Sequence, residues 1–175
     1  MIVSLDEQLE RVVKDAEFIA ALKTGFARFH DYRDALPLIP NSYTRTCLMR
    51  APRFELVAMQ WAPGSVSPIH DHGTSRCWVV MLEGALDVEN YDRLDDCTTS
   101  RAELRLNSSV TVSVGQLDHR LNNRELHRVR NTHKKSTYSL QVYSEPLTYY
   151  TTIVDEATGE CGRLDAKYEA TFDLK

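Results

Sequence analysis

The chain has 175 residues, of which 42% are hydrophobic and 26% are charged, a composition typical of one globular domain. Its formal net charge of -4 argues against nucleic acid or an anionic membrane as a partner, because either would require a basic face. The longest uninterrupted apolar run, Cys77 to Leu82, is too short to span a bilayer.

The N-terminus and the cysteines indicate the compartment. Acidic residues lie where a secretory signal would need a basic start followed by an apolar stretch; they are Asp6, Glu7, Glu10 and Glu17. We therefore expect a cytoplasmic protein. The four cysteines are scattered without a C-x-x-C pair, which excludes a zinc ribbon and predicts reduced thiols; they are Cys47, Cys77, Cys97 and Cys161.

The first forty residues have a helical pattern. Ser4-Leu5-Asp6-Glu7 has the S-x-x-E form of a capping box, and apolar residues then recur at helical spacing. This predicts a helix from about residue 5 to about residue 30, continuous or broken near Asp15, which Pro37 and Pro40 end. We expect its apolar face to pack against a core.

From Ser42 onward, short β-branched and aromatic runs alternate with turn residues. The predicted strands are Phe54–Trp61, Cys77–Leu82, Leu86–Tyr91, Arg101–Leu106, Val110–Val114, Ser136–Ser144 and Tyr149–Ile153. The predicted turns are Ala62-Pro63-Gly64, Glu83-Gly84, Asn107-Ser108-Ser109 and Gly115. Many short strands favour an all-β sandwich or barrel. We expect a single domain over residues 1–175, with a helical segment at 1–41 and a β-barrel at 42–175.

Three histidines form a candidate metal site. His70 and His72 are two residues apart, so on a β-strand both side chains point to the same side. Closure of a barrel would bring His127 alongside them. Three neutral imidazoles leave coordination positions open, which is typical of a catalytic metal site. His30, His119 and His133 have no such context, and we interpret them as ordinary polar residues.

The spacing around these histidines resembles the first motif of the cupin superfamily. Gly64 is followed by five residues, His70-x-His72, four residues, a position usually held by glutamate, six residues and Gly84. Cys77 stands at the glutamate position. His127-Arg128-Val129-Arg130-Asn131 is similar to the end of the second motif, although the proline and glycine expected before it are absent. The resemblance implies an all-β-dominated, jelly-roll-like cupin β-barrel with N-terminal α-helices.

Several further motifs are similar to those of the cysteine dioxygenase family. They are Tyr43-Thr44-Arg45, Ser67-Pro68-Ile69-His70-Asp71-His72, Cys77, Leu82-Glu83-Gly84, Leu126-His127-Arg128-Val129 and Ser139-Leu140-Gln141-Val142-Tyr143-Ser144. The resemblance implies that His70, His72 and His127 bind Fe(II). It also implies that Arg45, with Tyr43 beside it, binds the substrate carboxylate. A guanidinium suits that role because it can donate two parallel hydrogen bonds to a carboxylate.

The resemblance also implies roles for Tyr143 and for its neighbours on the same predicted strand. The Tyr143 hydroxyl would hydrogen-bond dioxygen or the substrate carboxylate. Cys77 is either joined to the Tyr143 side chain by a thioether or is a plain buried thiol. Ser139, Gln141 and Tyr143 alternate, so they should face one side. Gln141 replaces the family's histidine, and an amide cannot carry a proton as an imidazole does.

The implied reaction is the oxidation of L-cysteine to cysteine sulfinic acid by dioxygen, with no external reductant. The partners would be a small thiol and dioxygen, and the protein would be a monomer or a small homo-oligomer. Three alternatives stay open, of which a manganese or zinc cupin isomerase fits the contexts of Cys77 and Arg45 less well than the other two. The substrate would be 3-mercaptopropionate or another mercapto-acid, although the related dioxygenases that act on such substrates tend to carry glutamine at the position of Arg45. Otherwise the chain would be a non-catalytic cupin that binds a ligand or a metal.

Overall fold

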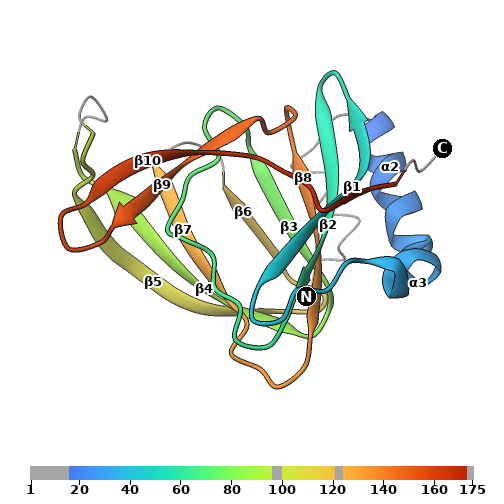
Figure 1. Ribbon diagram of the computed structural model, residues 1–175. Helices are drawn as coiled ribbons and strands as arrows, with labels where there is room; N and C mark the ends of the chain where they lie inside the picture. Colours follow the sequence, from blue (N-terminus) through green and yellow to red (C-terminus); the bar gives the residue numbers. More distant parts are fainter. Residues whose placement is uncertain (1–15, 96–99, 121–123, 173–175) are drawn as a thin grey trace, which may run out of the picture.

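The computed structural model describes residues 16–95, 100–120 and 124–172 (Figure 1). Its helical part consists of α2 (Ala16–Ala27), α3 (Phe29–Tyr32) and a 3₁₀ turn, η1 (Arg33–Ala35). The predicted helix is thus confirmed from residue 16, although it is interrupted at Arg28. Its first turns, with the capping box and Asp15, lie outside the described residues. No helix within the described ranges has the length and apolar character needed to cross a membrane.

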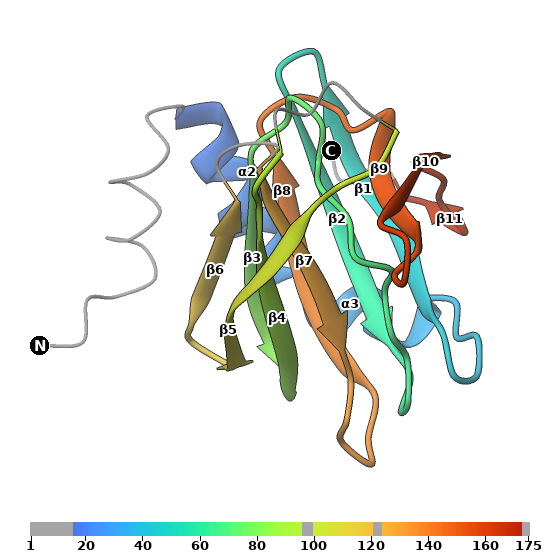
Figure 2. The same ribbon diagram turned by 90° about the vertical axis from the view of Figure 1, so that its left-hand side faces the viewer.

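The rest of the described chain is β-structure. The strands are β1 (Tyr43–Ala51), β2 (Phe54–Trp61), β3 (Cys77–Glu83), β4 (Ala85–Arg93), β5 (Leu104–Ser113), β6 (Leu117–Arg120), β7 (Glu125–Arg130), β8 (Thr137–Tyr143), β9 (Tyr149–Asp155), β10 (Glu160–Asp165) and β11 (Ala170–Thr171). One sheet has the order β11-β1-β2-β8-β3-β6. The other layer contains β5-β4-β7 and the β9–β10 pair (Figure 2). The predicted all-β, jelly-roll-like architecture is confirmed, but the sheets of the described residues form a two-layer sandwich and do not close into a barrel. The single-domain organisation stays a prediction.

The segment between β2 and β3 joins the two parts of the second layer. Residues 66–71 form isolated bridges at Val66 and His70, with a bend at Ile69, and no regular strand. His70 forms antiparallel bridges to His127 of β7 and to Thr152 of β9. The expectation that His70 and His72 lie on a regular strand is therefore wrong. Backbone pairing on both sides nevertheless gives this segment strand-like geometry.

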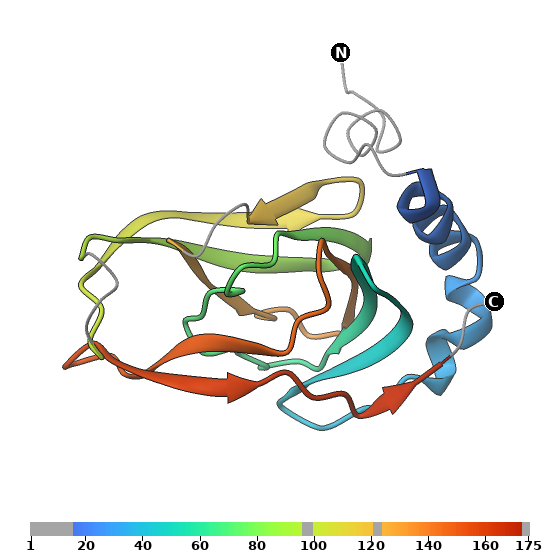
Figure 3. The same ribbon diagram turned by 90° about the horizontal axis from the view of Figure 1, so that it is seen from above.

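The central strands β2 and β8 are buried on both faces. Strand β2 is correspondingly rich in apolar residues, whereas β8 alternates apolar residues with the buried polar residues Ser139 and Gln141. The outer face packs under the helices, which lie on one side of the sandwich in Figure 3. Helix residues Leu22, Phe29 and Tyr32 pack there against Leu56 and Leu140. The inner face, with residues such as Val57, Val79 and Tyr143, packs toward the second sheet.

One predicted turn is wrong. The two strands expected at Arg101–Leu106 and Val110–Val114 are the single strand β5, which runs through Asn107 and Ser108. Asn90 of β4 pairs with Ser108 and the next residue, Tyr91, pairs with Leu106, so Asn107 is an extra residue in the register. Such a β-bulge accommodates a polar residue without ending the strand. The Asn107 amide donates a hydrogen bond to Asp92 at 3.1 Å.

Candidate active site

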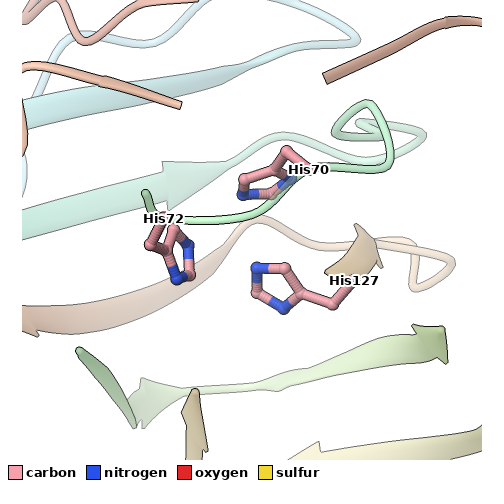
Figure 4. Close-up of side chains that lie close together, drawn as sticks. All are labelled: His70, His72 and His127. Carbon is pink, nitrogen blue, oxygen red and sulfur yellow. The ribbon is translucent and has the colours of Figure 1, made fainter. Parts of the chain in front are cut away.

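His70, His72 and His127 converge inside the sandwich. Figure 4 shows their rings pointing toward one another, His70 and His72 from the β2–β3 segment and His127 from β7. The ring centroids lie 4.5 to 5.2 Å apart, and one nitrogen from each ring falls within 4.8 Å of the others. Paired backbone hydrogen bonds of 3.0 Å between His70 and His127 fix their separation.

Several nitrogens of these rings lack a hydrogen-bond partner. His72 Nδ1 and both nitrogens of His127 are buried without one. His70 Nδ1 lies 2.9 Å from the Pro68 carbonyl oxygen, to which it can donate, and this leaves Nε2 as a free acceptor. Buried polar atoms are almost always satisfied, so unpaired ring nitrogens at one point fit a metal ion. Three imidazoles suit a divalent transition metal with open positions.

The electrostatics of the site keep the three rings neutral. Burial lowers the pKa of His70 to about 4 and holds the pKa values of His72 and His127 well below the ordinary value. The guanidinium of Arg120 adds to this effect at all three rings. At neutral pH the rings therefore carry free lone pairs, the form that binds a metal.

Asp71, between the two histidines, anchors the segment. Its Oδ1 accepts hydrogen bonds from the backbone N–H of Gly73 at 3.0 Å and of Thr151 at 2.8 Å. Its own N–H donates to the Thr151 carbonyl at 3.0 Å. Asp71 thus holds the histidine segment against β9.

Arg45 of β1 reaches the interior close to Tyr143. Its guanidinium carbon lies 5.6 Å from the centre of the Tyr143 ring, and its buried Nε and Nη2 have no hydrogen-bond partner. Arg45 also lines a cavity of about 650 Å³, together with Tyr43, Pro68 and Tyr150. Tyr150 packs against the His70 ring at 5.3 Å, so the cavity borders the histidine cluster.

Tyr143 and Cys77 are direct cross-strand neighbours on β8 and β3, and both are fully buried. The Tyr143 hydroxyl donates a hydrogen bond to the Gln141 side-chain oxygen, and its ring lies 5.5 Å from that of His72. Burial raises the pKa of the Cys77 thiol to about 12, so this group is protonated at neutral pH. Ser139, on the same face, accepts a hydrogen bond from Trp61 Nε1 at 3.1 Å.

Comparison with known proteins shows the family of this chain. A model of the family described as cysteine dioxygenase type I matches residues 1–154. The chain belongs to the cysteine dioxygenase family. Cysteine dioxygenase type 1 of Rattus norvegicus is 27% identical over 171 residues, which cover 97% of this chain and 79% of the relative. The Danio rerio protein of the same name is 32% identical over 136 residues, 77% of this chain and 62% of the relative.

Solved structures agree on the fold. A protein from Thermus thermophilus has a TM-score of 0.51 and 16% identity over 65% of this chain and 92% of its own. A Klebsiella pneumoniae protein with a double-stranded β-helix domain has a TM-score of 0.50 and 11% identity, and covers 77% of this chain and 93% of its own. At this identity the likeness shows the fold alone.

The structure of this cysteine dioxygenase family member brings all the predicted site residues into one region. Four neighbouring residues were not predicted from the sequence. These are Glu55, Arg120, Tyr150 and Tyr168, which lie next to predicted site residues. Glu55 had a signal, since it is the one acidic residue in the apolar run Phe54–Trp61. Arg120 had none, because its place beside Cys77 depends on the pairing of β3 with β6. The exposed His30, His119 and His133 are not part of the histidine cluster.

Proposed function

We propose that this protein is a mononuclear non-haem iron thiol dioxygenase that oxidises L-cysteine to cysteine sulfinic acid. The observation that carries the proposal is the convergence of three neutral imidazoles beside a buried guanidinium with unpaired donors. Family membership supports the reaction class. In this proposal His70, His72 and His127 hold Fe(II), and the substrates are a small thiol and dioxygen.

Iron(II) held there would supply the positive charge that favours a substrate thiolate and the redox centre for the reaction with dioxygen. Sulfur loses four electrons and dioxygen gains four, so both oxygen atoms enter the sulfinate and no external reductant is needed. Arg45 would bind the substrate carboxylate with charge-assisted hydrogen bonds and so fix the orientation of the thiol. The surrounding apolar side chains, such as Val79 and Met81, would keep bulk water away.

Tyr143 and Gln141 control one proton in this site. The Tyr143 hydroxyl donates to Gln141, so its oxygen is free to accept a hydrogen bond from the substrate. A rotation of the Gln141 amide would turn its N–H toward Tyr143 and release the tyrosine proton toward the substrate. We propose that this pair takes the place of a tyrosine oriented by histidine, and that Tyr43 and Ser139 help to shape the pocket.

Cys77 and Tyr143 are close enough in the sheet register to support a thioether between them. Its formation would remove two hydrogen atoms, which dioxygen would accept. The alternative is a plain buried thiol. Intact mass after reduction and denaturation decides between them, since a thioether survives reduction and lowers the mass by two hydrogens.

A mercapto-acid such as 3-mercaptopropionate is the second candidate substrate. Gln141 favours it, because it departs from the family pattern for cysteine, whereas Arg45 favours cysteine. The ratio of kcat/KM for the two substrates decides. Cytoplasmic location and a monomeric or small homo-oligomeric state stay predictions.

The test is anaerobic loading with Fe(II), quantification of the bound iron, and measurement of dioxygen uptake with a panel of thiols. We expect uptake with L-cysteine and one sulfinate formed per dioxygen, and no uptake by the His127→Ala variant. Iron-loaded protein that consumes no dioxygen with any thiol would overturn the dioxygenase assignment and favour a non-catalytic, ligand-binding cupin.

A further inference from the structure

A fully buried carboxylate lies beside Arg45. Glu55 of β2 has no exposed surface, and neither of its oxygens has a hydrogen-bond partner. Oε1 lies 3.8 Å from Arg45 Nη2, and Oε2 lies 3.7 Å from Nε of the half-exposed Arg50. A buried carboxylate is costly unless a cation compensates it, so Glu55 attracts the Arg45 guanidinium. It does so without using the hydrogen-bond donors of that guanidinium.

Tyr168 approaches the same guanidinium from the C-terminal segment. Its ring centre is 5.5 Å from the Arg45 guanidinium carbon. Burial raises the pKa of Tyr168, and the Glu55 carboxylate that its hydroxyl faces raises it further. The segment is anchored to β1 because the Glu169 N–H donates to the Arg45 carbonyl at 2.9 Å. The Glu169 carboxylate in turn accepts from the Arg45 N–H at 2.6 Å. These C-terminal residues lie beyond residues 1–154, where the family model matches.

The guanidinium thus lies near two aromatic rings, at 5.6 Å from the centre of the Tyr143 ring and 5.5 Å from that of the Tyr168 ring. Glu55 is also the direct cross-strand neighbour of Tyr143 on β8. Arginine has four rotatable side-chain bonds, so without such neighbours it would lose considerable entropy on binding a ligand. Glu55 and Tyr168 reduce that loss because they fix Arg45 before the ligand arrives.

We propose that Glu55 and Tyr168 are positioning residues that hold the Arg45 guanidinium for the substrate carboxylate, and that they set the preference for thiols that carry a carboxylate. The inference rests on the proposed function, since it assigns the substrate carboxylate to Arg45. It deepens that function by giving the C-terminal segment a part in substrate selection.

The test is calorimetric binding of L-cysteine and of cysteamine, which lacks the carboxylate, to Fe(II)-loaded protein under nitrogen. Glu55→Gln keeps the shape of the side chain and removes its charge, and it should weaken L-cysteine binding about tenfold. Tyr168→Leu removes the aromatic ring beside the guanidinium and should weaken L-cysteine binding about threefold. Cysteamine binding should change less than about twofold in both variants. The matched control is Glu89→Gln, because Glu89 pairs with Arg128 and Arg130 in the other sheet.

Equal weakening of the two thiols, or unchanged L-cysteine binding in both variants, would overturn the inference. If Glu55→Gln does not fold, Tyr168→Leu alone decides by the same comparison. Failure of the wild-type protein to bind L-cysteine would overturn the inference together with the proposed substrate. Wild-type protein that binds L-cysteine but does not oxidise it would overturn the dioxygenase assignment alone, and the binding comparison would still test Glu55 and Tyr168.

Discussion

Replacement of Arg45 by glutamine tests the carboxylate-binding role most sharply. A bidentate guanidinium–carboxylate contact consists of two charge-assisted hydrogen bonds, each worth about 1.5–3 kcal/mol. Arg45→Gln should therefore lower kcat/KM for L-cysteine by about 10²- to 10⁴-fold, because loss of this contact removes about 3–6 kcal/mol of transition-state stabilisation. Cysteamine has no carboxylate, so its kcat/KM should fall less than about fivefold.

The same substitution removes one of the two cations near the buried Glu55. Breaking a buried ion pair costs about 3–5 kcal/mol, and Arg50 at 3.7 Å from Glu55 remains, so we expect destabilisation of about 3 kcal/mol. The double variant Arg45→Gln/Glu55→Gln removes both charges. It should regain most of that stability in denaturant titrations and still discriminate poorly between the two thiols. Equal losses of kcat/KM for L-cysteine and cysteamine in Arg45→Gln would refute the assigned role.

Three further predictions concern stability. Because burial raises the pKa of Cys77 from 9.0 to about 12, the unfolded chain loses this proton first as the pH rises. In protein without a thioether, the difference in unfolding free energy between wild type and Cys77→Ala should thus fall by about 1.4 kcal/mol between about pH 8 and pH 10. A difference that stays constant over this range would contradict the prediction. Gly84 has φ +79, and an added Cβ would meet Thr137 Oγ1 at 2.5 Å, so Gly84→Ala should lower the unfolding free energy. We expect about 1–3 kcal/mol in urea titrations, and an unchanged midpoint would be inconsistent. Fe(II) at about a thousand times its Kd should stabilise the wild-type and His30→Ala proteins by about 4 kcal/mol in thermal melts, but not His127→Ala, and an equal gain in all three would exclude the histidine site.

The histidine cluster could be predicted because its signal is local. A spacing of two residues places His70 and His72 on one side of any extended chain, whether or not the strand is regular. His127 needed a long-range pairing, which the motif spacing supplied. The backbone bridge between His70 and His127 is the physical form of that pairing.

The predicted break at residues 107–109 was wrong because turn residues are also tolerated in a bulge. Whether the chain turns or continues as a strand here depends on β4, whose Asp92 and Asn90 side chains form hydrogen bonds with Asn107 and Ser108. Local composition carries no information about such partners.

The residues around Arg45 and Cys77 were missed for a similar reason. Glu55 becomes a neighbour of Tyr143, and Arg120 a neighbour of Cys77, only through the register of the six-stranded sheet. A shift by one residue would turn either side chain to the other face. The three clustered histidines could thus be found from local spacing and motifs, whereas the charged residues near them could be placed only from the strand order.

We propose above all that this site transfers both atoms of one dioxygen molecule to the sulfur of a thiol. The most direct measurement is mass spectrometry of the product formed by Fe(II)-loaded protein from L-cysteine and isotopically labelled dioxygen. We predict a sulfinate in which both oxygen atoms carry the label. A product with a single labelled oxygen, or cystine formed without label, would contradict the claim.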